Sequence, residues 1–331
     1  MKKDNCNQVN GDASLLTVQE IDRLLDSFRK TERNRFLQQT NQITTNVNIN
    51  EIKKDISYAT NLMEEMFNYV GNGGNLPIEE IKADVIPLIK KAAEIPHVYH
   101  LFYELQSKDE YTYRHTICVG IISTIIGKWL GIPQEPLKEL TLAATLHNIG
   151  MSRLDKSILN KPGKLTEEEY NQMKQHTIIG YEILRDIPEL SADIAIVALQ
   201  HHEREDGNGY PLGLLGDQIH RYSKIVAIAD SFHAMSSTRV YSRAKPFYEV
   251  ISDMQNSAFG KLDPNIMLIF LYKLMDNLAG KTVLLSDNSF GKIVMIHPFD
   301  PLRSLVKVGD ELIDLRYNKE LQIVRIIDGQ E

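Results

Sequence analysis

The sequence predicts a mainly α-helical protein, in which a central helical bundle lies between a helical N-terminal region and a small C-terminal β unit. Up to about residue 280, apolar residues recur at helical spacing, and the run Ile225–Asp230 is apolar except for its final acid. Beyond that point, short β-branched runs such as Ile293–Ile296 and Ile323–Ile327 alternate with turn signals. We therefore expect three units: residues 1–107, 108–279 and 280–331.

Composition narrows the class of protein. The 331 residues suffice for about two domains. A hydrophobic content of 43% and a charged content of 24% are ordinary for globular chains. The net charge of −7 and the lack of a basic run argue against duplex nucleic acid as a partner. The start has no signal-peptide pattern, the run Thr116–Leu130 is too short to span a membrane, and two distant cysteines form no disulfide framework. We expect a cytoplasmic protein.

The N-terminal region is predicted to be helical. Thr17–Glu20 forms a capping box that opens a first helix. A second amphipathic helix runs from Ile52 to Val70 and ends in a glycine-rich stretch. Another begins near Pro77, and Pro87 is expected to kink or divide it. We interpret this region as an input or dimerisation module, although its apolar stripes fit an ordinary core equally well.

The central helices are the most apolar part of the chain. Thr116–Leu130 is apolar on nearly every face, which predicts a helix at the centre of the bundle. The next helix begins near Pro136, a residue suited to a first turn. A second capping box, Thr166–Glu169, opens a further helix, and a later apolar helix ends at His201.

Five histidines and one acid stand in or at the ends of these apolar helices: His115, His147, His176, His201, His202 and Asp230. A single buried histidine is usually a satisfied core residue. Five of them with an acid, whose unpaired burial would cost several kcal/mol, favour a metal site instead. Imidazole is the commonest transition-metal ligand, and helical bundles build such sites from inward-facing side chains. The stiff loop that ends in Gly209-Tyr210-Pro211 would form a lip for the substrate.

Seven segments together resemble the HD-GYP domain, a family of helical phosphohydrolases that degrade the bacterial messenger cyclic di-GMP. The resemblance covers residues 111 to about 275. The matching segments, in chain order, are Tyr111–His115, Leu146–Gly150, Ile158–Gly163, Leu165–Glu169, His201–Arg204, Asp206–Pro211 and Phe259–Pro264. The resemblance implies an HD-type helical bundle.

The resemblance also implies roles for individual residues. The five histidines and Asp230 would be ligands of two or three iron or manganese ions, and zinc also suits imidazole-rich sites. Tyr210, Pro211 and Arg239 would contact cyclic di-GMP or a related dinucleotide. A guanidinium such as that of Arg239 matches the forked geometry of phosphate. Tyr210 and Asn148 would stand at the catalytic position.

Several positions depart from the family pattern. Asn148 stands where the family has the aspartate that bridges two metals, and a neutral amide offsets less repulsion between dications. Met151 replaces a phosphate-facing lysine. The other departures are Tyr111 for a glutamate, His233 for an aspartate and Ser242 for a basic residue. The metal is therefore expected to bind more weakly than in the family, or to be absent.

Three functions remain open from the sequence. The first is a cyclic di-GMP receptor or regulatory module with impaired hydrolysis, which the changed positions favour. The second is an active phosphodiesterase that yields linear dinucleotide or GMP, which the intact histidine set and the Tyr210 loop favour. The third is a structural interaction adaptor. A homodimer or a regulatory protein partner fits each of them.

Overall fold

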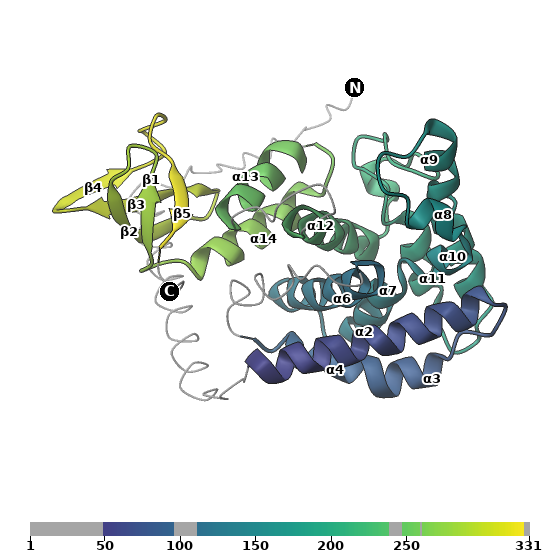
Figure 1. Ribbon diagram of the computed structural model, residues 1–331. Coiled ribbons are helices and arrows are strands. Elements are labelled where there is room, and N and C mark those ends of the chain that lie inside the picture. Colours follow the sequence, from purple (N-terminus) through teal and green to yellow (C-terminus); the bar gives the residue numbers. More distant parts are fainter. Residues whose placement is uncertain (1–48, 96–110, 238–246, 259, 328–331) are drawn as a thin grey trace, which may run out of the picture. The chain divides into compact units, whose positions relative to one another are not determined.

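The computed structural model describes residues 49–95, 111–237, 247–258 and 260–327 (Figure 1). Within it, residues 49–331 form one compact unit. Helices make up most of this unit and a small sheet follows them, which confirms the predicted fold class. The predicted helix that starts near Thr17 lies outside the described residues, as does Arg239. Among the described helices, none is long and apolar enough to cross a membrane.

The helices of the N-terminal region pack directly on the central bundle. Helix α2 (Ile49–Gly71) contacts helix α6 (Tyr111–Trp129) and the 3-10 turn η2 (Ile149–Arg153). Helix α3 (Ile78–Glu80), the π-helical turn η1 (Ile81–Val85) and helix α4 (Ile86–Ala92) form one continuous rod. Pro87 has no N–H to donate, and the wider π turn directly before it accommodates the proline without dividing the rod.

The central elements surround α6, as its apolar faces predict. These elements are α6 (Tyr111–Trp129), α7 (Gln134–Leu146), η2 (Ile149–Arg153), α8 (Lys156–Leu159), α9 (Glu167–Lys174), α10 (His176–Arg185), α11 (Ala192–Gln200), η3 (Gly216–Gln218) and α12 (Arg221–Ser236). Helix α6 contacts α2, α4, α7, α12 and the later helix α14 (Pro264–Asp276), so nearly all of its faces are covered. The predicted capping box at the start of α9 is present: Glu169 N–H donates to Thr166 Oγ1 and Thr166 N–H donates to Glu169.

Two glycines let η2 and α10 touch backbone to backbone. A Cβ atom on Gly150 would lie 2.0 Å from the carbonyl oxygen of His176 and 2.5 Å from the nitrogen of Gly180. Neither neighbour is a side chain that could turn away, so only glycine fits here. This close approach brings the turn that carries His147 and Asn148 next to the start of α10.

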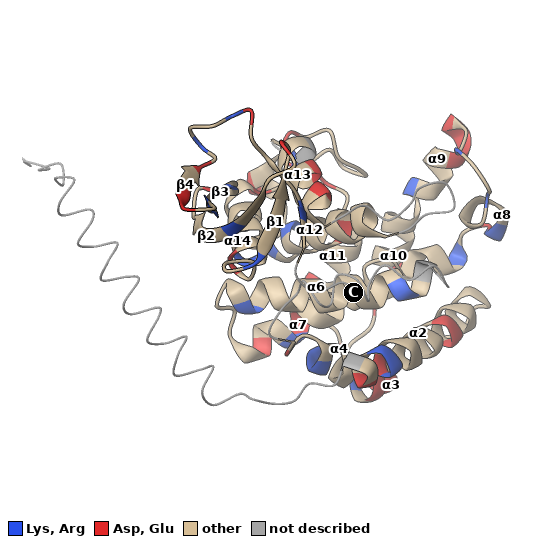
Figure 2. Cartoon of the chain, turned by 60° about the vertical axis from the view of Figure 1, so that its left-hand side comes forward, with Lys and Arg blue, Asp and Glu red and all other residues tan. Residues whose placement is uncertain are grey.

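A five-stranded antiparallel sheet follows helices α13 (Phe247–Ala258) and α14 (Pro264–Asp276), as the β-branched runs predict. Its order is β4-β3-β2-β1-β5. The strands are β1 (Thr282–Leu285), β2 (Phe290–His297), β3 (Asp300–Val308), β4 (Glu311–Asp314) and β5 (Ile323–Ile326). Helix α14 packs on β2 and β3, and the Tyr248 hydroxyl donates to the carbonyl of Leu302 at 2.6 Å. Lysines, arginines and acids are spread over both the helices and the sheet (Figure 2).

Candidate metal centre

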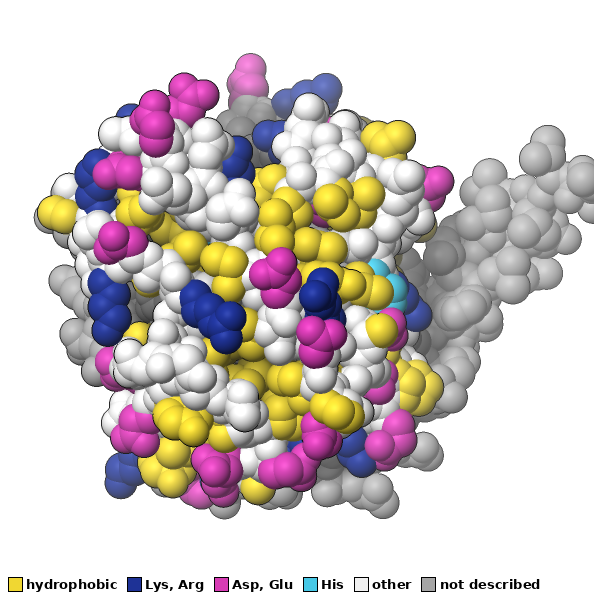
Figure 3. Space-filling model, turned by 90° about the vertical axis from the view of Figure 1, so that its right-hand side faces the viewer, with side chains coloured by type: hydrophobic (Ala, Val, Ile, Leu, Met, Phe, Trp, Pro, Cys, Tyr) yellow, Lys and Arg dark blue, Asp and Glu magenta, His cyan; other side chains and the backbone are white. Residues whose placement is uncertain are grey.

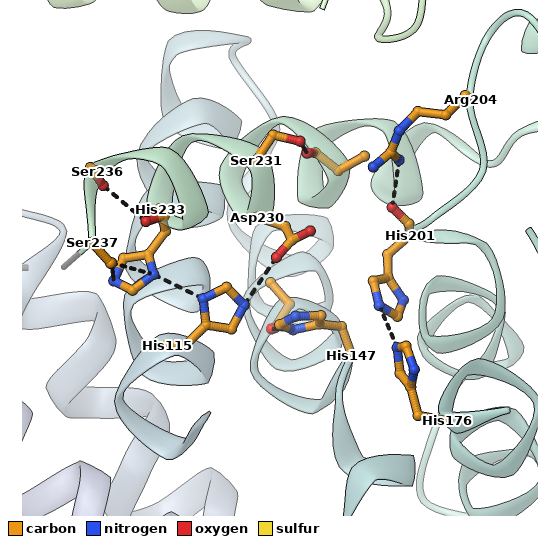
Figure 4. Close-up of polar contacts among 12 residues, drawn as sticks. His115, His147, His176, His201, Arg204, Asp230, Ser231, His233, Ser236 and Ser237 are labelled. Carbon is orange, nitrogen blue, oxygen red and sulfur yellow. Dashed lines mark hydrogen bonds and ion pairs between the residues drawn. The ribbon is translucent and has the colours of Figure 1, made fainter. Parts of the chain in front are cut away.

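The six side chains singled out in the sequence meet in two adjoining groups. His176, His201 and His202 form one group, and His115, His147 and Asp230 form the other. Within each group the ligand atoms all lie within 4.8 Å of one another. The rings of His147 and His201 join the groups, with their centroids 4.9 Å apart (Figure 4).

Helix ends bring most of these side chains together. His147 and His201 are the residues at which α7 and α11 end, and His176 is the first residue of α10. His115 lies in the second turn of α6, whereas Asp230 lies well inside α12. The candidate ligands therefore come from five different helices, a construction that is typical of sites inside helical bundles.

Three of the histidines are oriented by the same kind of hydrogen bond to the backbone. The Nδ1 atoms of His147, His176 and His201 lie 2.7, 2.6 and 2.9 Å from the carbonyl oxygens three residues earlier. A carbonyl oxygen only accepts, so each Nδ1 must carry the ring proton, and each Nε2 presents a lone pair. Nε2 of His176 and Nε2 of His201 are 3.3 Å apart. Two lone pairs facing each other at this distance call for a cation between them.

Two buried acceptors on neighbouring residues, His147 Nε2 and Asn148 Oδ1, have no hydrogen-bond partner among the residues that the structure describes. An unsatisfied buried acceptor costs about 1–3 kcal/mol. His147 Nε2 is an acceptor in one of the two three-donor groups, so a divalent transition metal bound there would satisfy it. The donor set of this chain therefore fits a metal.

Burial keeps His147, His176, His201 and His202 neutral, whereas Asp230 stays ionised. Burial lowers the pKa of His147 to about 4 and holds the pKa values of His201 and His202 well below their usual range. Burial alone would raise the pKa of Asp230. The hydrogen bond from His115 outweighs burial and holds the pKa of Asp230 well below its usual range. Neutral imidazoles with an ionised carboxylate are the forms that bind a metal.

His233 belongs to this centre, although sequence analysis treats it only as a departure from the family pattern. Its Nδ1 lies 2.8 Å from Nδ1 of His115, whose Nε2 lies 3.0 Å from Asp230 Oδ1. The Ser237 hydroxyl is 3.2 Å from His233 Nε2. The signal was present in the sequence, because residues three apart on a helix share a face and His233 follows Asp230 by three.

The predicted lip lies against the histidine groups. The Tyr210 ring stacks on His202, with centroids 4.6 Å apart and planes 25° apart, and the Tyr210-Pro211 peptide is cis. A buried carboxylate that the sequence analysis left without a role, Glu203, holds this loop. Its two oxygens accept the N–H groups of Leu212 at 2.7 Å and Leu214 at 2.9 Å.

Five imidazoles and a carboxylate inside a helical bundle place this chain among helical proteins with a candidate metal centre. Within that class, residues 97–266 match the HD domain family, and the chain belongs to this family. The match confirms the resemblance found in the sequence at the level of the HD domain.

Relatives with known names agree with this assignment. The chain is 32% identical over 248 residues to a cyclic di-GMP phosphodiesterase of Pseudomonas aeruginosa, covering 72% of this chain and 58% of the relative. It is 38% identical over 239 residues to a cyclic di-GMP phosphodiesterase of Thermotoga maritima, covering 68% and 62%. A 3'3'-cGAMP-specific phosphodiesterase of Vibrio cholerae is 30% identical over 206 residues, covering 62% and 42%. The chain thus spans less than two thirds of the length of each relative.

A solved structure confirms the fold. An HDG"Y"P protein from Bdellovibrio bacteriovorus superposes with a TM-score of 0.52 at 20% sequence identity. The superposition covers 73% of this chain and 78% of that protein. At this level of identity the likeness concerns the arrangement of the helices.

Proposed function

We propose that this protein is a metal-dependent phosphodiesterase of cyclic dinucleotides, with cyclic di-GMP as its first candidate substrate. The observation that carries the proposal is the pair of adjoining three-donor groups, in which the buried His147 Nε2 has no hydrogen-bond partner among the described residues. When bound, divalent metals neutralise the charge of a phosphodiester and lower the pKa of water, so that a nucleophile is available at neutral pH. Iron and manganese are the first candidates, followed by zinc.

The chain's own residues have separable tasks in this proposal. Three imidazoles hold one metal, and His115, His147 and Asp230 hold the other. Burial raises the pKa of Tyr210, so its phenol stays protonated and its hydroxyl can donate to a phosphate oxygen. Pro211 fixes the direction of the loop beside that ring. Arg239, outside the described residues, remains a predicted phosphate contact.

A second candidate is a cyclic di-GMP receptor with little hydrolysis. Two residues favour it: Asn148 contributes no negative charge between two dications, and Met151 contributes no positive charge toward a phosphate. Both candidates share the ligand and the metal groups, so they differ only in turnover. The third reading, a structural adaptor, requires neither metal nor nucleotide.

One preparation separates the three candidates. Iron, manganese and zinc are measured in the purified full chain, and cyclic di-GMP binding and turnover are followed in parallel. We expect bound metal, nucleotide binding and release of linear dinucleotide or GMP. His202→Ala should abolish turnover and reduce the metal content, whereas His220→Ala, a histidine that caps α12 away from both groups, should change neither.

The other outcomes are equally informative. Metal and nucleotide binding without turnover would favour the receptor hypothesis over the phosphodiesterase hypothesis. If neither metal nor nucleotide binds, the structural adaptor is the candidate function that remains.

A further inference from the structure

Helix α9 borders the metal centre without being part of the core. Each of its residues keeps some exposure to solvent. The helix is held instead by its capping box and by an ion pair, in which Lys161 Nζ lies 2.7 Å from Glu169 Oε1. Figure 3 shows the side of the molecule that Figure 1 presents at its right, where apolar side chains lie exposed among charges of both signs. Burial of an apolar stripe therefore does not explain why α9 lies where it does.

The last turn of α9 is tied to a metal-group histidine. The carbonyl of Met173 accepts the Nδ1–H of His176 at 2.6 Å. Tyr170 and Lys174 stand four residues apart, so they share one face of α9. The Lys174 ammonium lies 5.1 Å from the centre of the Tyr170 ring and 6.0 Å from that of Tyr210.

These contacts continue directly into the centre. The rings of Tyr170 and Tyr210 lie 6.4 Å apart in an edge-to-face arrangement, and Tyr210 in turn stacks on His202. Tyr170 is 48% exposed, so much of its ring is open to solvent. A cation and an open aromatic ring thus stand beside the tyrosine of the lip.

The charge on Lys174 is not matched by a carboxylate. Its side chain is half-buried, and within the described part of the chain it makes no ion pair, only the two ring contacts. A partly desolvated ammonium favours an anion as its partner. Met151 stands where the family pattern has a phosphate-facing lysine, and Lys174 supplies a cation at the lip.

We propose that Tyr170 and Lys174 form a second substrate-binding wall, in which Lys174 contacts a phosphate and Tyr170 stacks on a purine base. The inference rests on the proposed function and deepens it. A cyclic dinucleotide has two phosphodiesters and two bases, so only one phosphodiester can lie at the metals. The other phosphate and its base need a cation and an aromatic face a short distance away, and α9 presents both.

Binding measurements on the full chain test this wall. Dissociation constants for cyclic di-GMP and cyclic di-UMP are measured by calorimetry at several salt concentrations, with the metal content determined for each variant. We expect Lys174→Met to weaken cyclic di-GMP binding about tenfold or more and to flatten its salt dependence. Lys174→Arg should keep most of the affinity. Tyr170→Leu should weaken cyclic di-GMP binding about fivefold or more and cyclic di-UMP binding less, while Tyr170→Phe retains both.

The controls are an exposed lysine and an exposed tyrosine elsewhere, Lys164→Met and Tyr58→Leu, which should bind as the wild type does. Metal content should be unchanged in all variants. Wild-type affinity and salt dependence in Lys174→Met and Tyr170→Leu would overturn the wall while leaving the phosphodiesterase proposal intact. Lack of any cyclic dinucleotide binding by the metal-loaded wild type would overturn both.

Discussion

The Nδ1 atoms of His115 and His233 lie 2.8 Å apart, so one of these buried rings must donate a proton to the other. If His115 donates, its Nε2 presents a lone pair to a metal beside Asp230. If His233 donates, His115 Nε2 carries a proton and donates to Asp230 at 3.0 Å. Metal binding selects the first arrangement, because a protonated Nε2 cannot be a ligand.

His233 should therefore control metal affinity through His115. We expect His233→Ala to lower the affinity for Mn²⁺ about tenfold or more, in the range seen when partners of metal ligands are removed. His233→Asp also offers an acceptor to His115 Nδ1 and should keep the affinity. Titration with Mn²⁺ measures both, and His297→Ala, a buried histidine of the sheet, is the matched control. Equal affinities of wild type and His233→Ala would contradict this role.

Asn148→Asp adds a negative charge directly after His147, where the family pattern has an aspartate. Because Asn148 Oδ1 is buried without a hydrogen-bond partner among the described residues, a carboxylate there would gain from a bound dication. We expect metal content or turnover to rise. Metal analysis and product release measure the gain, with Asn160→Asp in an exposed loop as the control. No gain, even when combined with Met151→Lys, would show that the missing bridge is not the main defect.

Glu203→Gln should loosen the lip. The amide nitrogen would face one of the two N–H groups that the carboxylate now accepts, leaving a buried donor unsatisfied at a cost of about 2 kcal/mol in the free energy of unfolding. Denaturant titration measures the loss. Glu182→Gln, at an exposed position on α10, should leave the free energy of unfolding unchanged. A variant as stable as the wild type would mean that Leu212 and Leu214 find other acceptors.

Gly150→Ala should separate η2 from α10. The added Cβ would meet the His176 carbonyl at 2.0 Å, and overpacking of this kind costs about 1–3 kcal/mol. Because the shift moves His147 away from His176, metal affinity should fall together with stability. A Cβ on Gly180 would meet nothing closer than Ala198 Cβ at 3.3 Å and the Gly150 nitrogen at 3.4 Å, so Gly180→Ala should be milder. Thermal unfolding with and without Mn²⁺ compares the two variants. A larger loss of stability in Gly180→Ala than in Gly150→Ala would contradict the close backbone contact between η2 and α10.

Periodic patterns predicted the helices and the sheet because α6 is apolar all round and the strands are β-branched. They also singled out the six side chains that the structure brings together, since histidines and an acid inside apolar helices are unusual. Local patterns could not show that Glu203 turns back to hold a loop nine residues later, or that Tyr170 on an exposed helix meets Tyr210. Those contacts depend on how distant segments pack. The limits of the three predicted units remain predictions.

The hydrogen bonds from His147, His176 and His201 to carbonyls three residues earlier have a consequence for how such a centre changes over evolutionary time. Backbone carbonyls fix the tautomers of these three rings, so the rings keep their orientation when neighbouring side chains are exchanged. His115 relies on another side chain and is the ligand most open to drift. A lineage could thus alter its chemistry at one end of the centre while the other end stays ready for metal.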